Sequence, residues 1–469
     1  MKPFDEEIVS GSILRSVWKL AWPVTLLNLV NGMHGFVDNA LVGHYLSSPD
    51  NAANASIGVA WSVFLVIVVF IASLFHGMNV LISRYAGRQD RENLSRAAYQ
   101  SFLCSVFILA ILAPVGYVIA PYLLDFVASE ARVKAYALPY LRIMFTCGAP
   151  LFLMFMFTGA FQASGDPKIP LVLGIMTTVL NIVVSTVLIV GLGPLPALGT
   201  VGAAVGTVVA PVPSVIIAIV LILRGKTIIQ GPAHYSFRPD FRVLKTITRI
   251  GLPTGIQGVL LNLGGIFLLR YIGQLEHSAA AQAAYTICYA QLFSLVTWTC
   301  FGLRSAAATL MGQNIGAGKP ARGKQAVAVA SVFGAVWAMF WGLFYWFAPG
   351  LLLGIFEAVD EPVFSYGKSL LQYLTFSGIV LAITLALTGG LQGAGETKIP
   401  MYIAFLTQIL VLLGICEYLK MSGMLTPDRV WMAIFISHLS RLVLTYAVFR
   451  TERWTEKRIE LSEEAVEAG

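Results

Sequence analysis

Charged residues are scarce in this chain of 469 residues. Asp, Glu, Lys and Arg make up 12% of it, against about 25% in soluble domains. Hydrophobic residues make up 57%, and the mean hydropathy is +0.77. A protein core cannot bury this much hydrocarbon, so we expect the lipid bilayer to surround most of the chain. The composition therefore predicts an integral membrane protein.

Several other features are missing as well. The five cysteines are odd in number and lie in or near apolar stretches, so neither a disulfide framework nor a metal site is indicated. No P-loop, HExxH or GxSxG motif occurs, which argues against ATP coupling, hydrolysis and any enzymatic cofactor. No cleavable signal peptide is recognisable in the first 20 residues. The net charge of +7 does not indicate nucleic-acid binding, because the basic residues lie in short loops.

Twelve apolar segments are each long enough to cross a bilayer. We predict an all-α membrane protein with membrane spans at 16–46, 52–81, 94–120, 133–163, 168–191, 200–224, 247–273, 279–313, 322–349, 362–392, 398–420 and 427–450.

Lys and Arg residues gather on one side of these spans. Most lie in the N-terminal segment, in alternate loops and in the C-terminal tail, whereas the opposite loops are richer in Asp and Glu. By the positive-inside rule, both termini are cytoplasmic. We expect a bacterial-type inner (plasma) membrane.

An internal repeat divides the chain. The segment FQASGDPKIP at 161–170 returns 230 residues later as LQGAGETKIP at 391–400, and the same offset relates Pro23 to Pro253. Two copies of one six-span unit explain this offset, and an even number of spans gives both copies the same orientation. The predicted organisation is an N-terminal lobe at 1–224, a cytoplasmic linker at 225–246, a C-terminal lobe at 247–450 and a cytoplasmic tail at 451–469.

Asp38 lies well inside the first predicted span. On a helix, Asn31, His34 and Asp38 fall on one polar stripe. A carboxylate within hydrocarbon is costly and is a functional hypothesis by default, because burial makes it easier to protonate near neutral pH. Asp38 is thus a candidate proton carrier. The alternative is a structural carboxylate held by Asn or His hydrogen bonds.

Several stretches together resemble the multidrug and toxic compound extrusion (MATE) family, within a wider flippase-like superfamily. They are the two repeated motifs, VDNALVGHYL at 37–46, VLNIVVSTVLIVGLGPLPALGTVGAAVGT at 179–207 and TLMGQNIGAGKPARGKQA at 309–326. The resemblance implies twelve transmembrane helices in two pseudo-symmetric six-helix lobes, V-shaped around a central cavity. It also implies export of organic cations or amphiphilic compounds, driven by inward proton or sodium flow.

The resemblance also implies roles for single residues. The family places an acidic residue at the position of Asp38, and Asn181 matches the Asn of its fifth-span motif. The family often has Asp one turn later, where this chain has Ser185. Coupling would then depend on Asp38 with neutral partners, and His34 could supply a second titrating group. Pro23 could provide a hinge in the same helix, or only a static kink.

The second half offers candidates for a substrate cavity. Arg270 and Arg304 either extend their charges to a membrane interface or face the cavity, where they would favour anionic or amphiphilic substrates. Gln257 and Asn262 could supply uncharged contacts, and Tyr289 could supply an aromatic wall. Arg441 and His438, on one face of the last span, form a further pair.

We therefore predict a secondary active exporter of amphiphilic or cationic small molecules, antiported against protons by alternating access. Its predicted partners are the substrate, protons or sodium, and membrane lipids, and we expect a monomer. The alternatives are a flippase for a lipid-linked oligosaccharide or other lipid, and sodium-coupled efflux. A channel or a membrane receptor is a further alternative, although tandem halves argue against it.

Overall fold

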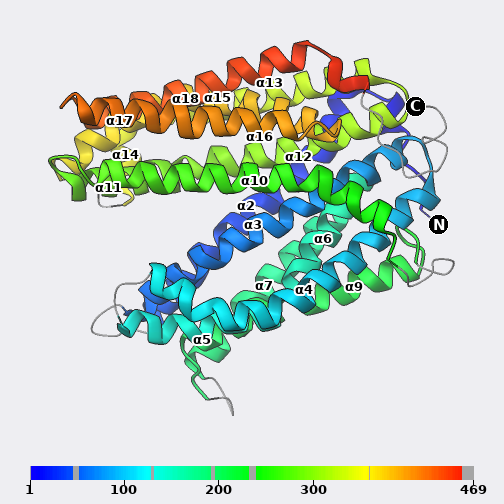
Figure 1. Cartoon of the computed structure of the whole chain (residues 1–469), viewed down its shortest axis with the longest axis horizontal. Coiled ribbons are helices and arrows are strands. Elements are labelled where there is room, and N and C mark those ends of the chain that lie inside the picture. Colours follow the sequence, from blue (N-terminus) through cyan, green and yellow to red (C-terminus); the bar gives the residue numbers. More distant parts are fainter. Residues whose placement is uncertain are drawn as a thin grey trace. The chain divides into compact units, whose positions relative to one another are not determined.

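The computed structural model describes residues 2–45, 52–127, 131–191, 196–231, 239–356, 358 and 360–456. Of residues 31–45, 52–55, 74 and 126 it describes only the backbone. Every regular element in these ranges is a helix (Figure 1). The all-α prediction is therefore confirmed for the described residues.

The helices of the first half follow one another closely. They are α1 (Glu7–Ser10), α2 (Ile13–Tyr45), α3 (Ala52–Gly87), α4 (Arg91–Val127), α5 (Ala131–Cys147), α6 (Ala149–Ser164), α7 (Lys168–Val190), α8 (Thr200–Val209) and α9 (Pro211–Leu223).

The second half contains two π-helical segments and one 3-10 segment among its α-helices. In order these are α10 (Phe241–Ile272), α11 (Ser278–Tyr285), π-helix η1 (Thr286–Leu292), α12 (Ser294–Gly316), α13 (Pro320–Phe347), α14 (Pro349–Gly354), α15 (Val363–Gly393), α16 (Lys398–Phe405), π-helix η2 (Leu406–Leu413), α17 (Gly414–Met421), α18 (Pro427–Arg450) and 3-10 helix η3 (Arg453–Glu456).

Within the described residues, 10 helical stretches are long and apolar enough to cross a membrane. The pair α5 and α6, bent by 53° at Gly148, makes an eleventh if it is counted as one span. The remaining predicted span, 16–46, coincides with α2, part of which is described by its backbone alone. The chain is an integral membrane protein, and the number twelve stays a prediction.

The chain forms two compact units. One unit comprises Met1–Phe4, Leu29–Gly251 and Leu461–Gly469, and the other comprises Asp5–Asn28 and Leu252–Glu460. The division falls inside α2 and inside α10, the two long helices that contain Pro23 and Pro253. The predicted lobe boundaries at the 225–246 linker stay a prediction. We call the two units unit 1 and unit 2 and describe each by itself.

The helix α15 is the centre of unit 2. It packs against α11, α12, α13 and α18, and 61% of its most apolar window is buried, against at most 44% for any other candidate span. Gly389 and Gly393 lie on its side toward α12. A Cβ added to them would lie 2.3 Å from the carbonyl oxygen of Arg304 and 2.1 Å from that of Ala308. These two glycines therefore let the backbones of α12 and α15 approach closely.

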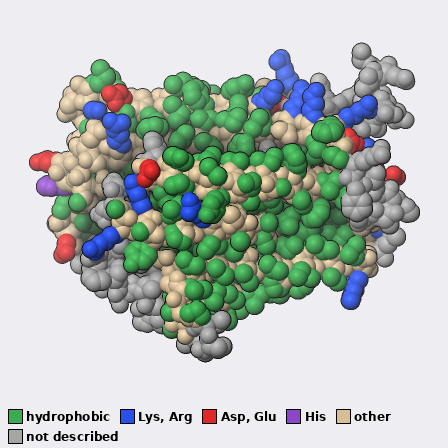
Figure 2. All heavy atoms as spheres, turned by 60° about the horizontal axis from the view of Figure 1, so that its bottom comes forward, with side chains coloured by type: hydrophobic (Ala, Val, Ile, Leu, Met, Phe, Trp, Pro, Cys, Tyr) green, Lys and Arg blue, Asp and Glu red, His purple; other side chains and the backbone are tan. Residues whose placement is uncertain are grey.

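Other helices expose apolar faces to the outside of the protein. In α13, most of the exposed large side chains recur every three or four residues: Val332, Val336, Met339, Phe340, Leu343, Phe344, Trp346 and Phe347. Hydrophobic side chains form a broad continuous surface on the face shown in Figure 2, where charged side chains are sparse. A face of this kind is stable in contact with lipid and would aggregate in water.

The two copies of the repeated motif form the same turn. Gly165 and Gly395 have positive φ angles of 95° and 82°. After each glycine, a backbone N–H closes the preceding helix: Asp166 N donates to Phe161 O, and Glu396 N donates to Leu391 O, both over 2.9 Å. The next helices begin at Lys168 and Lys398. Both copies thus form a tight turn, and glycine is required because its φ is left-handed.

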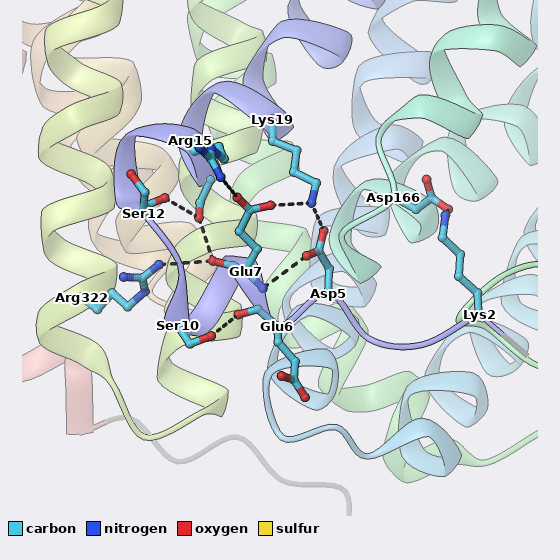
Figure 3. A network of polar contacts seen from close by, with 11 residues as sticks. Lys2, Asp5, Glu6, Glu7, Ser10, Ser12, Arg15, Lys19, Asp166 and Arg322 are labelled. Carbon is cyan, nitrogen blue, oxygen red and sulfur yellow. Dashed lines mark hydrogen bonds and ion pairs between the residues drawn. The ribbon is translucent and has the colours of Figure 1, made fainter.

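A polar network holds the N-terminal segment (Figure 3). In unit 2, Lys19 Nζ pairs with Asp5 Oδ2 at 2.5 Å and Glu7 Oε2 at 3.0 Å, and the hydrogen bond from Lys19 lowers the pKa of Glu7 below its usual value. Arg322 Nη2 donates to the carbonyl oxygen of Ile8 over 3.3 Å. In unit 1, Lys2 pairs with Asp166 of the repeated turn. These contacts tie the segment before α2 to the ends of the helices.

We expect Gly393→Val to destabilise unit 2. The added side chain would overlap the backbone of α12, and overpacking of this kind costs about 1–3 kcal/mol. The melting temperature of the purified protein in detergent should therefore fall by several degrees. Gly354→Val is the matched control, because no atom lies within 4 Å of a Cβ at that position. Equal melting temperatures for the two variants would contradict the close packing of α12 and α15.

Candidate functional site

The first group of predicted site residues lies on α2. Pro23 is buried in its first half. The helix continues through Tyr45, so the helical spacing assumed for Asn31, His34 and Asp38 holds for the backbone. Their side chains lie outside the described residues, and the proton-carrying role of Asp38 stays a prediction.

Asn181 and Ser185 belong to a buried polar cluster in unit 1. Asn181 Nδ2 donates to Ser185 Oγ over 3.4 Å and to Thr207 Oγ1 over 3.3 Å, which joins α7 to α8. All three residues are at most 3% exposed. The helices approach closely here, since a Cβ on Gly206 would lie 2.1 Å from Ser185 Oγ. Asn181, Ser185 and Thr207 thus lie together and are all uncharged, while their role as neutral partners of Asp38 stays a prediction.

Arg304 lies in unit 2 with two glutamines. Its Nε and Nη2 donate over 3.0 and 2.7 Å to the single amide oxygen of Gln392. Gln392 Nε2 in turn donates to Gln257 Oε1 over 2.9 Å. The network joins α12, α15 and α10, and Gln392 belongs to the repeated motif. The guanidinium charge is thus held by a neutral amide oxygen.

A cavity of about 210 Å³ lies elsewhere in unit 2, between α10, α11, η1, η2 and α18. Of the residues predicted for a substrate cavity, Asn262 and Tyr289 line it, whereas Gln257 and Arg304 belong to the network above and Arg270 is exposed in the last turn of α10. The other polar residues that line it are Tyr285, Gln408, Ser437 and His438.

Both π-helical segments face this cavity, with Tyr289 in η1 and Gln408 in η2. A π-helix shifts the backbone hydrogen bonds to i→i+5 and often marks a functional site. Side chains from neighbouring helices bind carbonyl oxygens of these segments: Ser437 Oγ donates to Thr407 O over 2.8 Å, and Tyr345 Oη donates to Leu292 O over 2.8 Å. The π-helical geometry is therefore supported by specific contacts.

Arg441 on α18 borders the cavity through Gln408. Its Nη2 donates to Gln408 Oε1 over 2.6 Å and its Nε donates to Thr407 Oγ1 over 3.1 Å. Arg441 is 8% exposed and His438, one turn away, is 6% exposed. The His438 ring contacts those of Tyr289 and Phe293, each with a centroid distance of 6.5 Å. Arg441 and His438 were predicted to share one face of this helix, which is confirmed.

Sequence reasoning missed Tyr285 and Ser437 as cavity residues. The signal was present in α18, where a buried stripe at Trp431, Ile434, Ser437, His438 and Arg441 changes from apolar to polar. Nothing comparable marked the π-helices, because their residues fit an ordinary apolar helix.

The fold and these sites define a class: an integral membrane protein with polar and cationic sites buried among apolar helices. Within that class, the chain belongs to the MatE family, whose family model matches residues 23–187 and 253–415. The two matches begin at Pro23 and Pro253, which are the two prolines related by the repeat offset.

Curated relatives match over most of their length. A "Probable multidrug resistance protein NorM" from Thermotoga maritima is 25% identical over 458 residues, covering 97% of this chain and 96% of the relative. An "FAD transporter" from Shewanella oneidensis is 23% identical over 339 residues, covering 72% of each.

Solved structures share the fold. A MOP superfamily transporter from Pyrococcus furiosus has a TM-score of 0.88 at 19% identity, covering 98% of this chain and all of that chain. An outward-facing MATE family transporter of the same superfamily has a TM-score of 0.87 at 18% identity, covering 96% of this chain and 98% of that chain.

We expect Gln392→Leu to destabilise the protein by about 2–4 kcal/mol, because Arg304 would lose its amide acceptor while remaining buried. The double variant Arg304→Met with Gln392→Leu removes the charge as well and should recover part of that loss. Unfolding in denaturant, measured for the two single variants and the double variant, gives the coupling free energy. Additive effects would show that the two side chains do not depend on each other.

Proposed function

We propose that this protein is a secondary active exporter of amphiphilic or cationic small molecules, working by alternating access and driven by protons. Membership of the MatE family, whose model matches both halves of the chain, is the observation that carries the export function. Several relatives have names that describe multidrug resistance proteins, which supports small organic molecules as the substrate class. The repeat offset of the two matches supports a tandem arrangement of two lobes.

Proton coupling is assigned to Asp38. Within 29–251, every other acidic residue lies outside the predicted spans or near a helix end: Asp50, Asp90, Glu92, Asp125, Glu130, Asp166 and Asp240. Of the described members of this group, Asp125 pairs with Lys134, Asp166 with Lys2 and Asp240 with Arg96. Asp38 is thus the acid of this region that remains for a role within the membrane, where a carboxylate can exchange its charge for a proton.

The Asn181 cluster supports this assignment. Its three described side chains are neutral and buried, so they can orient a partner without titrating themselves. In the proposal, Asp38 takes a proton from the outside and releases it inside, with Asn31, His34, Asn181 and Ser185 as neighbours and Pro23 as the hinge of α2. Both termini are cytoplasmic in this scheme.

The flippase alternative needs several basic residues that converge on one headgroup. Arg304 is held by Gln392, and Arg270 lies at the end of another helix with its side chain exposed. The two arginines share no hydrogen-bond partner among the described residues. This observation favours export of small molecules over transport of a lipid-linked oligosaccharide.

Asp38→Asn should abolish efflux driven by a pH gradient in proteoliposomes, because an amide cannot carry the proton. Asp125→Asn, an exposed acid at the end of α4, is the control and should transport normally. Sodium gradients are imposed separately, so efflux that responds to sodium alone would replace protons as the coupling ion. Undiminished pH-driven efflux by folded Asp38→Asn would refute the coupling role.

A further inference from the structure

We propose that the cavity in unit 2 binds the anionic group of a small organic carboxylate, with Arg441 as the countercharge. For convenience we call it the Arg441 cavity; its polar residues are Asn262, Tyr285, Tyr289, Gln408, Ser437 and His438. As a part of transport, this inference depends on the proposed function, but binding itself does not require transport. The cation and amphiphile export proposed above does not account for this cavity.

The first argument is the charge of Arg441. Both of its described partners, Thr407 and Gln408, are neutral, and no acidic residue lines the cavity. A buried cation without a countercharge is costly in a membrane protein, because its lost hydration is only partly replaced by neutral acceptors. Arg441 does not itself line the cavity but lies directly behind Gln408, which does. A carboxylate in the cavity would supply the missing negative charge across Gln408, and the polar groups of the lining would donate hydrogen bonds to its oxygens.

The second argument is an excess of unused hydrogen-bonding groups at the cavity. The buried Nδ1 atom of His438 has no hydrogen-bond partner. The hydroxyl groups of Tyr285 and Tyr289 have none among the described residues either. Protein interiors rarely leave a buried group such as the Nδ1 of His438 unpaired. Two hydroxyl donors and an imidazole beside an arginine form an environment that an oxygen-rich anion would satisfy.

The third argument is the shape of the cavity. Its volume of about 210 Å³ far exceeds the roughly 10–15 Å³ that one water needs, but it is smaller than the about 300–1,000 Å³ of typical drug sites. The rings of Tyr285 and Tyr289 stack on each other with centroids 5.0 Å apart and planes at 10°, so this part of the lining is a packed aromatic stack. A small carboxylate therefore fits better than a bulky amphiphile.

The fourth argument is the backbone. Two π-helical segments, η1 and η2, open toward the same cavity. Gly265 of α10 also lines it, and a Cβ at this position would meet no atom within 4 Å. The space beside Gly265 is therefore open, and it offers a way to fill the cavity without touching Arg441.

The test measures equilibrium binding of benzoate to the purified full-length protein in detergent, with benzamide as its neutral analogue of equal shape. We expect saturable benzoate binding and at least about tenfold weaker binding of benzamide, which carries no negative charge to compensate the guanidinium. Equal affinities for the two probes would overturn the proposal. Stronger binding of inorganic phosphate than of benzoate would overturn the assignment to carboxylates.

Two variants and two controls locate the binding. Arg441→Gln should weaken benzoate binding at least about tenfold. Its control is Arg450→Gln, because Arg450 is an exposed arginine at the end of the same helix.

Gly265→Leu should abolish binding by filling the cavity, and it tests the proposal independently if Arg441→Gln does not fold. Gly414→Leu is its control, since that site is exposed and also has open space. Wild-type binding by folded Gly265→Leu or Arg441→Gln would place benzoate elsewhere.

These outcomes are independent of transport. If benzoate binds in the expected pattern but pH-driven efflux is absent, the proposed function fails and the binding site stands. If efflux depends on Asp38 but benzoate does not bind, the inference fails alone.

Discussion

Inside a membrane protein, every buried charge must find its partners within the protein, because the surrounding hydrocarbon offers none. The described part of unit 2 meets this constraint with neutral amide and hydroxyl oxygens. Arg304 donates two hydrogen bonds to Gln392, and Arg441 donates to Gln408 and Thr407. Neutral partners hold these cations in place but do not compensate their charge. The positive charge is therefore left available to another group.

The same constraint accounts for the local backbone. The π-helices η1 and η2 place backbone acceptors and polar side chains where an ordinary helix would have closed its own hydrogen bonds. Neighbouring helices bind two of these acceptors through Ser437 and Tyr345. A cavity lies beside these segments, between α10 and α18, whereas α15 packs closely against α12 through Gly389 and Gly393. Close packing thus occurs between α12 and α15, and the open space lies between α10 and α18.

Unit 1 has a different polar chemistry. Its described buried cluster at Asn181, Ser185 and Thr207 carries no charge. Near the ends of its described helices, Asp125, Asp166 and Asp240 are each paired with a base. Burial by itself would raise the pKa of the Asp240 carboxyl. Hydrogen bonds from Arg96 and from the backbone N–H groups of Val243 and Arg242 nevertheless hold this pKa below its usual value. Such a carboxylate stays ionised at neutral pH and contributes stability that is lost only when the pH falls through its lowered pKa. In the described part of this unit, the buried cluster between helices is neutral and the ion pairs lie near the helix ends.

The sequence by itself determined the helical membrane architecture, the repeated turns and the family, because these depend on hydrophobic length, glycine positions and local motifs. It also placed Asn181 beside Ser185, and Arg441 beside His438, since helical spacing alone brings each of these pairs together. Thr207 of α8 meets Asn181 only through the packing of α7 against α8. Only the tertiary structure decided that Asn262 and Tyr289 share a cavity, that Arg304 and Gln257 meet through Gln392, and that two helices become π-helical. These outcomes depend on packing between helices far apart in the chain, and no local pattern of residues encodes that packing.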